Sequence, residues 1–270
     1  MASLAGYETK RGLFLKVESG EMYNRKGNET QNSGRSYSLA GEKSKTANLE
    51  TLNRAKEMEE NGNSRDEIYN ETGWVKGKDD KWRYEIPDNL DKINFATLRN
   101  SISRGYGMCM LPDIYKNKQL YAAYPFLEDV FVITSETEEN NRYQKNDYGE
   151  LSIHINIEDV KRKKMSPKDK AVLLHEIQHA IQDYEGFVGG TSLKGAKQYR
   201  NNEIAVKRRE LEAQGHYDEA EATVEEQRKI LQTPDYEFFD DYMNFGGEQE
   251  AREVAIRAEK RKQKKQLKHL

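Results

Sequence analysis

Residues 173–180 read Leu-Leu-His-Glu-Ile-Gln-His-Ala, and this stretch determines what kind of domain the chain is expected to form. His175 and His179 are four positions apart, so on a helix their side chains lie on one face and can reach one ion. Zinc suits two neutral imidazoles, and it keeps an open position for water. Glu176 is one position further round, where its carboxylate can accept a proton from that water. The stretch therefore predicts a zinc-binding helix with a built-in base.

The flanking residues predict where this helix lies. Ser166 is a suitable N-cap, Pro167 suits the first helical position, and an acid follows in the first turn. We expect the helix to run through Tyr184 and to stop before Gly186. Ahead of it, residues 151–157 alternate between apolar and polar side chains, which predicts a strand with one polar face. An edge strand at this place would hold an extended peptide beside the metal through main-chain hydrogen bonds.

A catalytic zinc ion needs a third protein ligand, and the helix itself cannot supply it. Asp183 continues the series from His179, but ligands at i and i+8 are about 12 Å apart along a helix axis. His154 lies on the preceding strand, where we expect it to face substrate or solvent. The last helix begins near Gly247 and offers Glu248 and Glu250. Helical periodicity slightly favours Glu248, because its face carries smaller and more apolar side chains, so the residues alone leave both acids open.

The motif and its surroundings resemble known families. His-Glu-x-x-His with a downstream Glu-Ala is similar to the gluzincin group of metallopeptidases. Several strings, in order over most of the chain, resemble the large polyvalent protein-associated domains of bacteriophages and conjugative elements: residues 37–43, 71–74, 81–86, 123–125, 174–182, 185–187 and 247–252. The resemblance implies an α+β, zincin-like domain in a protein of a phage or mobile element. It also implies zinc ligands His175, His179 and Glu250, the glutamate directly before a small residue, and it makes Glu176 the catalytic base.

This fold is expected to combine a small mixed sheet, an active-site helix, a helical hairpin and a C-terminal helix. We assign residues 1–46 to a flexible N-terminal arm, residues 47–258 to the zincin-like domain and residues 259–270 to a basic tail. The hairpin, residues 199–232, is an insertion, because the gap from His179 to Glu250 is longer than is usual in gluzincins. Further strands are expected at 81–86 and 129–134, and a loop at 136–146.

Composition narrows the class of protein. Only 35% of the 270 residues are hydrophobic and 34% are charged, and no stretch is apolar enough for a membrane helix. The single cysteine, Cys109, excludes an intrachain disulfide and a cysteine-only zinc site. Without a secretory signal at the N-terminus, we expect the cytoplasm of a host cell and no membrane partner. Although the net charge is only −3, the C-terminal tail, residues 259–270, is strongly basic. We interpret this tail as a solvated helix end, and nucleic-acid binding is the less favoured alternative.

The leading hypothesis is therefore a zinc-dependent metallopeptidase that cleaves a protein or peptide, with a host protein among the candidate substrates. The alternative is a catalytically silent, zinc-stabilised interaction module that binds a host protein. Glu176 favours the enzyme, because a purely structural site has no use for a base. The residues that could stabilise the oxyanion are Tyr242, Tyr148, His154 and Arg252. Glu185 could orient a ligand histidine, and Trp74 and Trp82 are expected in the core.

Overall fold

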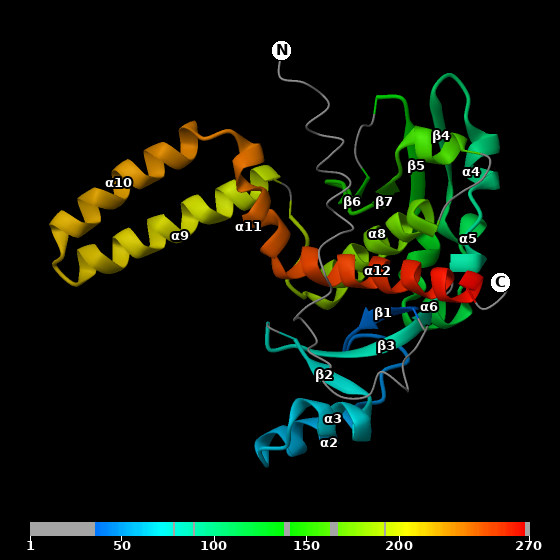
Figure 1. Ribbon diagram of the computed structural model, residues 1–270, viewed down its shortest axis with the longest axis horizontal. Coiled ribbons are helices and arrows are strands. Elements are labelled where there is room, and N and C mark those ends of the chain that lie inside the picture. The colour runs from blue at the N-terminus through cyan, green and yellow to red at the C-terminus, as the bar shows by residue number, and fades with distance from the viewer. Residues whose placement is uncertain are drawn as a thin grey trace. The chain divides into compact units, whose positions relative to one another are not determined.

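The computed structural model describes residues 36–77, 79–88, 90–137, 141–162, 167–191 and 193–267. The chain divides into two compact units. Met1–Phe187 and Glu250–Leu270 form the first, here called the main unit, and Val188–Gln249 form the second, here called the hairpin unit. Helices and strands are both present, so the fold class is α+β as expected (Figure 1). Within the described residues, no helix is both long and apolar enough to cross a membrane.

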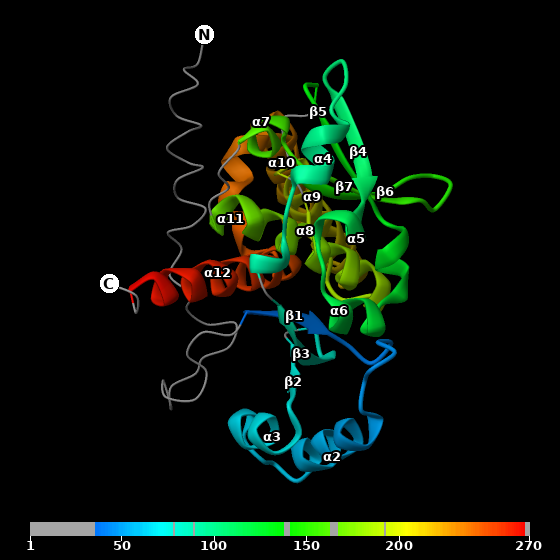
Figure 2. The same cartoon turned by 90° about the vertical axis from the view of Figure 1, so that its right-hand side faces the viewer.

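The first part of the main unit is a three-stranded antiparallel sheet. Its order is β1 (Ser36–Ala40), β3 (Trp82–Asp88) and β2 (Trp74–Lys76). Figure 2 shows α2 (Leu49–Glu60) and α3 (Arg65–Thr72) on the same side of this sheet. Trp74 and Trp82 are buried between sheet and helices, which confirms their assignment to the core.

Local sequence signals fix where α3 begins and ends. Ser64 caps α3, and the side chain of Glu67 bonds back to it in a capping box. Gly73 ends α3 with a φ of 77°, a left-handed conformation that glycine adopts without the Cβ clash. The strand predicted at 81–86 is β3, which continues through Pro87 to Asp88, and Pro87 pairs with Tyr37 of the outer strand β1.

The second sheet has four strands in the order β4 (Tyr106–Met110), β5 (Phe131–Ser135), β7 (Leu151–His154) and β6 (Arg142–Lys145). Only β5 and β7 pair in parallel. The prediction of a loop at 136–146 is therefore wrong for β6, and β7 is an inner strand rather than an edge strand. Because the side chains of β6 are exposed or half-buried, it lacks the apolar alternation that marks a strand.

Short elements connect these sheets to the helices. They are η1 (Leu90–Lys92), α4 (Ala96–Ser101), α5 (Leu111–Ile114), α6 (Lys118–Ala123), η2 (Pro125–Asp129) and α7 (Ile157–Lys161). The predicted strand 151–157 is shortened at its end, since Ile157 begins α7.

Two longer helices complete the main unit. α8 (Pro167–Glu185) carries the His-Glu-x-x-His motif and lies beside α12 (Gly246–Leu267), as the hydrogen bonds from Gln178 and Gln182 to Glu250 show (Figure 1). The boundaries of α8 confirm the predicted helix, although its proposed cap, Ser166, lies outside the described residues. The apolar side of α8 is fully buried in the largest core cluster: Leu173, Leu174, Ile177, Ala180 and Ile181.

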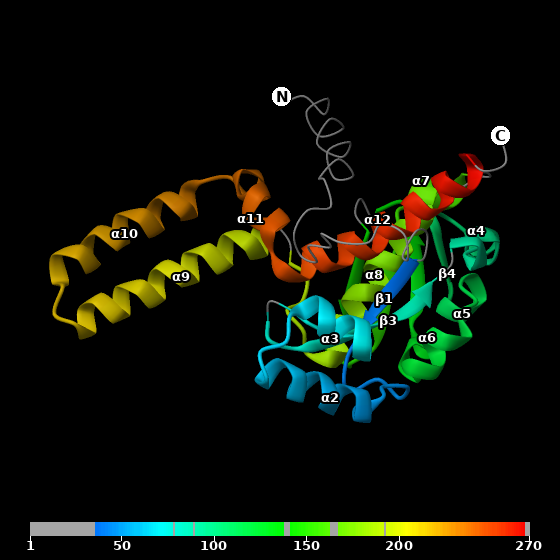
Figure 3. The same cartoon turned by 60° about the horizontal axis from the view of Figure 1, so that its bottom comes forward.

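The hairpin unit contains the predicted helical hairpin. α9 (Leu193–Ala213) and α10 (Tyr217–Gln232) lie antiparallel (Figure 3), and Gly215 turns the chain with a φ of 82°. η3 (Asp235–Phe238) and α11 (Phe239–Asn244) follow. The compact unit, residues 188–249, extends beyond the predicted hairpin of 199–232, and whether it is an insertion stays a prediction.

The limits of the predicted arm and tail also change. Residues 1–35 lie outside the described part of the chain, but residues 36–40, assigned to the flexible arm, form β1. Backbone hydrogen bonds to β3 and the burial of Leu39 and Ala40 stabilise this segment. Because it contains few apolar residues, its sequence pattern does not predict a strand. In the tail of 259–270, the backbone of α12 is helical to Leu267.

A buried carboxyl group ties the first sheet to the core. Asp88 accepts hydrogen bonds from Ser38 Oγ at 2.5 Å, from Asn117 Nδ2 at 3.0 Å and from the hydroxyl of Tyr115. Burial nevertheless raises the pKa of Asp88 above its ordinary value, and the bonds from Ser38, Tyr115 and Asn117 only partly offset that shift. Ionisation of Asp88 is therefore harder in the folded than in the unfolded chain.

The stability of the parent should fall relative to that of Asp88→Asn as the pH rises. A raised folded pKa means that the folded state holds its proton longer, so stability is lost between the unfolded pKa, about 4, and the raised folded value. Urea unfolding of both proteins from pH 4 to pH 8 measures the difference. A difference that is constant with pH would contradict the assignment, and Asp88→Ala, which leaves the donors without this acceptor, should be the less stable variant.

Candidate metal centre

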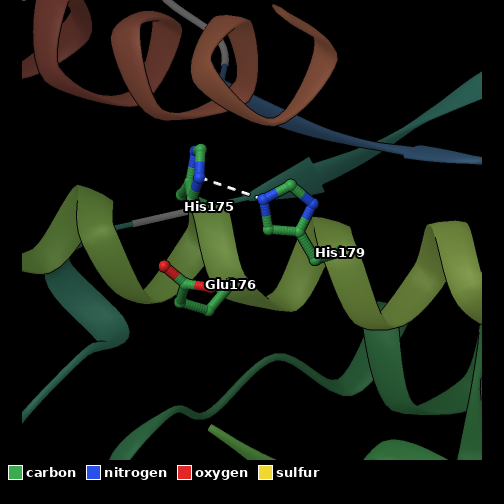
Figure 4. A group of neighbouring side chains, drawn as sticks. All are labelled: His175, Glu176 and His179. Carbon is green, nitrogen blue, oxygen red and sulfur yellow. Dashed lines mark hydrogen bonds between the residues drawn. The ribbon is translucent and has the colours of Figure 1, made fainter. Parts of the chain in front are cut away.

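Three side chains of the motif lie together on α8. The Nε2 atoms of His175 and His179 are 3.1 Å apart. Both rings project from the same side of the helix, with Glu176 at an adjoining position (Figure 4). One ligand atom from each of His175, Glu176 and His179 lies within 4.8 Å of the other two, the only such group among the described residues. The predicted motif thus forms a compact donor cluster.

The spacing of the two nitrogens fits one zinc ion. Zinc–imidazole bonds of 2.0–2.1 Å in a tetrahedral site place two ligand nitrogens about 3.3 Å apart. The observed 3.1 Å is close to that value, so a small rotation of the rings would suffice. Glu176 is buried while both imidazoles are half-buried, so the carboxylate lies next to the nitrogens but largely away from bulk water. The donor set and its spacing therefore fit a zinc ion.

His175 is held in its neutral form. Burial lowers its pKa well below the ordinary value, and the charges of His179 and Arg252 lower it further. A backbone hydrogen bond with Ala251 acts in the opposite direction. Neutral imidazole is the form that binds a metal ion. Arg252, one of the four candidates for the oxyanion donor, contributes to this lowered pKa through its positive charge.

His179 is oriented from its other nitrogen. Its Nδ1 is 2.8 Å from Oε1 of Gln182, one turn further along α8. The other ring nitrogen, Nε2, is the one that faces His175. Outer partners of this kind commonly fix how a ligand histidine is turned. Gln182 thus has the place that the sequence analysis considered for Glu185.

Glu250 is not part of the histidine cluster. Its Oε1 accepts from Gln178 and Gln182, each at 3.0 Å, and its Oε2 accepts from Arg83 Nε at 2.6 Å. These bonds direct the carboxylate toward β3 and the later turns of α8. Its role as the third zinc ligand stays a prediction, and the described structure does not bring it together with His175 and His179.

The other candidate acids have separate surroundings. Glu248 belongs to the hairpin unit, where its Oε1 accepts from the backbone N–H of Thr191 at 3.0 Å. Glu185, in the main unit, does not orient a histidine. Its carboxylate accepts from Tyr124 Oη at 2.7 Å and from the backbone N–H of Lys43 at 3.0 Å. These bonds connect the end of α8 to the segment after β1.

The remaining candidates for polarising a carbonyl belong to different elements. Tyr148 is 91% exposed on the turn between β6 and β7, and Tyr242 belongs to the hairpin unit. His154 is buried on the inner strand β7, with Nε2 3.2 Å from Ser152 Oγ. It therefore does not face solvent, and the other expectation, that it faces substrate, stays a prediction. Asp183 accepts from Tyr143 Oη of β6 at 3.0 Å.

Sequence reasoning missed three residues around the cluster: Arg83, Gln178 and Gln182. Gln178 and Gln182 lie three and seven positions after His175 and therefore share its helix face, a signal that was present in the sequence. Gln178 Oε1 accepts from the N–H of Leu39, and its Nε2 donates to the carbonyl of Leu39, both at 2.9 Å. This pair of bonds fastens α8 to the outer strand β1.

The three-stranded sheet lies in a part of the chain that matches a known family. Residues 37–94 match the family model described as Large polyvalent protein associated domain 23. We call these residues the polyvalent-protein segment. It spans β1, α2, α3, β2 and β3, and it contains both Leu39 and Arg83, which bond to Gln178 and Glu250. No curated protein and no solved structure matches the chain.

Proposed function

We propose that this protein is a zinc-dependent metallopeptidase of a phage or mobile element. The observation that carries the proposal is the pair of Nε2 atoms 3.1 Å apart with the buried Glu176 beside them. The match of residues 37–94 to a polyvalent-protein domain supports the association with a mobile element. The zincin-like character rests on the motif and on the resemblance of residues 174–182 to such domains.

His175 and His179 would hold the zinc ion, which when bound polarises a peptide carbonyl and makes water more acidic. Glu176 would accept a proton from the attacking water and deliver it to the leaving amine. The positive charge of Arg252, close enough to lower the pKa of His175, would favour negative charge on the carbonyl oxygen. Each step uses a residue that lies in the cluster or acts on it.

A zinc-stabilised interaction module that binds a host protein is the second candidate. One observation favours it: the described group contains Glu176 as its only carboxylate, and a closed site in which Glu176 coordinates the ion would have no base. Both candidates require the histidine pair, so they differ in what Glu176 does and in whether the zinc-loaded chain cleaves peptides.

The parent chain should bind one zinc ion, and the variant His175→Ala, His179→Ala should bind it more than about 100-fold more weakly, because losing ligands exceeds the 10–100-fold cost of losing an outer partner. Metal analysis and competition with a chelator give the affinity. The zinc-loaded parent, incubated with a mixture of unstructured peptides, should produce new amino termini, and the double variant should produce none.

His216→Ala is the matched control. His216 is exposed at the start of α10 and pairs with Glu219, so its loss should change neither zinc content nor cleavage. Equal zinc content in the parent and the double variant would overturn the metal site. Zinc binding without cleavage of any peptide would favour the interaction module.

A further inference from the structure

We propose that Glu250 and Gln182 form a positioning relay that fixes His179 as the tautomer with hydrogen on Nδ1 and a lone pair on Nε2. The relay begins at Arg83 in the polyvalent-protein segment and ends at the ring of His179. Its significance rests on the proposed function, because the lone pair it directs toward His175 is the one that would hold zinc. The tautomer itself exists without metal.

The first step is the orientation of the Gln178 amide. Its Oε1 accepts from the backbone N–H of Leu39 and its Nε2 donates to the carbonyl of the same residue, so oxygen and nitrogen cannot be exchanged. The same Nε2 then donates to Glu250 Oε1 at 3.0 Å. On the other oxygen, the charged Arg83 donates at 2.6 Å. Both oxygens of Glu250 therefore accept hydrogen bonds.

The second step is the orientation of the Gln182 amide. Its terminal group also contacts Glu250 Oε1 at 3.0 Å, and an accepting carboxylate oxygen requires the NH₂ of Gln182 there. The amide oxygen must then face Nδ1 of His179, at 2.8 Å. Because an amide oxygen only accepts, Nδ1 carries the hydrogen, and Nε2 of the neutral ring carries the lone pair. In the metal-free chain the hydrogen of the 3.1 Å bond between the two Nε2 atoms is therefore donated by His175.

Burial makes the alternative arrangement costly. Gln178 and Gln182 are both 0% exposed and Glu250 is 1% exposed, so no bulk water can compensate for a reversed amide. Reversing Gln182 would set its oxygen against a carboxylate oxygen and lose the bonds at both ends. Arg83 is itself held by Asp79, with contacts of 2.6 and 2.9 Å, and by the ring of Phe187. The anchor of the relay is thus rigid.

Nuclear magnetic resonance of the zinc-free chain, labelled with ¹⁵N in histidine, tests the relay directly. Spectra recorded at pH 8 give the ¹⁵N shifts of the two imidazole nitrogens, and these shifts distinguish the tautomers. The signals of His179 are identified by their loss in His179→Gln. We expect the Nδ1–H tautomer in the parent, whereas free histidine in water prefers Nε2–H.

Gln182→Met should shift His179 toward the Nε2–H tautomer and weaken zinc binding about 10–100-fold. Gln232→Met is the control: Gln232 is exposed at the end of α10 and is not a member of the relay, so the tautomer should persist. An Nε2–H tautomer in the parent would overturn the relay, as would an unchanged tautomer in a folded Gln182→Met. The parent spectrum decides even where a variant fails to fold.

Failure of the relay and failure of the proposed function give different results. The relay is tested by the tautomer of His179 in the zinc-free chain. An Nδ1–H tautomer in a chain that cleaves no peptide therefore supports the relay and contradicts the proposed peptidase function. Peptide cleavage by a chain whose His179 is the Nε2–H tautomer does the reverse.

Discussion

Replacing Glu176 by glutamine should leave the fold and zinc binding unchanged and reduce peptide cleavage by about 100- to 10,000-fold, the usual contribution of a general base. The amide has nearly the shape of the carboxylate but cannot accept the proton of the attacking water. One ligand atom of Glu176 lies within 4.8 Å of both histidine nitrogens, which is close enough for this transfer. Cleavage rates and zinc content are measured on the same preparation.

Glu225→Gln is the control for this substitution. Glu225 is exposed on α10 and pairs with Arg228, so losing its charge should affect neither cleavage nor zinc. Cleavage that survives Glu176→Gln would show that Glu176 is not the base. A loss of zinc together with cleavage would instead make Glu176 a ligand, which is the arrangement of the silent interaction module.

Much of the fold follows from local signals. The capping box at Ser64, the left-handed Gly73 and Gly215, and the apolar stripe of α8 are each determined by residues that are close together in the sequence. β1 and β6 are outer strands with few apolar side chains, so no alternation marks them. Their stability comes from backbone pairing with β3 and β7, a property of the partner strand that a local pattern does not contain.

The candidate site also contains a part that local sequence predicts and a part that depends on residues far away in the chain. The pairing of His175 with His179 is a consequence of helical spacing, and the sequence contains it in full. The surroundings of Glu250 depend on Arg83, which is 167 positions away in the chain. The small residue after Glu250 favours a position of that acid beside α8, and Glu250 does lie there. The sequence pattern could not show that a buried cation and two amides surround its carboxylate.

The ion pair between Glu250 and Arg83 leads to the second large expected effect. Both side chains are almost completely buried, at 1% and 3% exposure. Removing one partner of a buried pair commonly destabilises a protein by about 3–5 kcal/mol, because the other charge stays in a medium that solvates it poorly. Since Asp79 keeps its own contacts with Arg83, we expect about 3 kcal/mol for Glu250→Gln, toward the low end of that range.

Urea unfolding of the zinc-free protein separates the anchor from the ligand interpretation of Glu250. An anchor is required before metal binds, so Glu250→Gln should lower the free energy of unfolding in the absence of zinc, while Glu203→Gln, in the exposed pair with Arg200, should not. A metal ligand behaves in the opposite way. Its carboxylate adds little to the metal-free fold, and its loss is felt when zinc is added. If Glu250→Gln left the stability of the zinc-free protein unchanged but greatly reduced its zinc affinity, Glu250 would be a zinc ligand. Its carboxylate would then have to leave Arg83 when the ion binds.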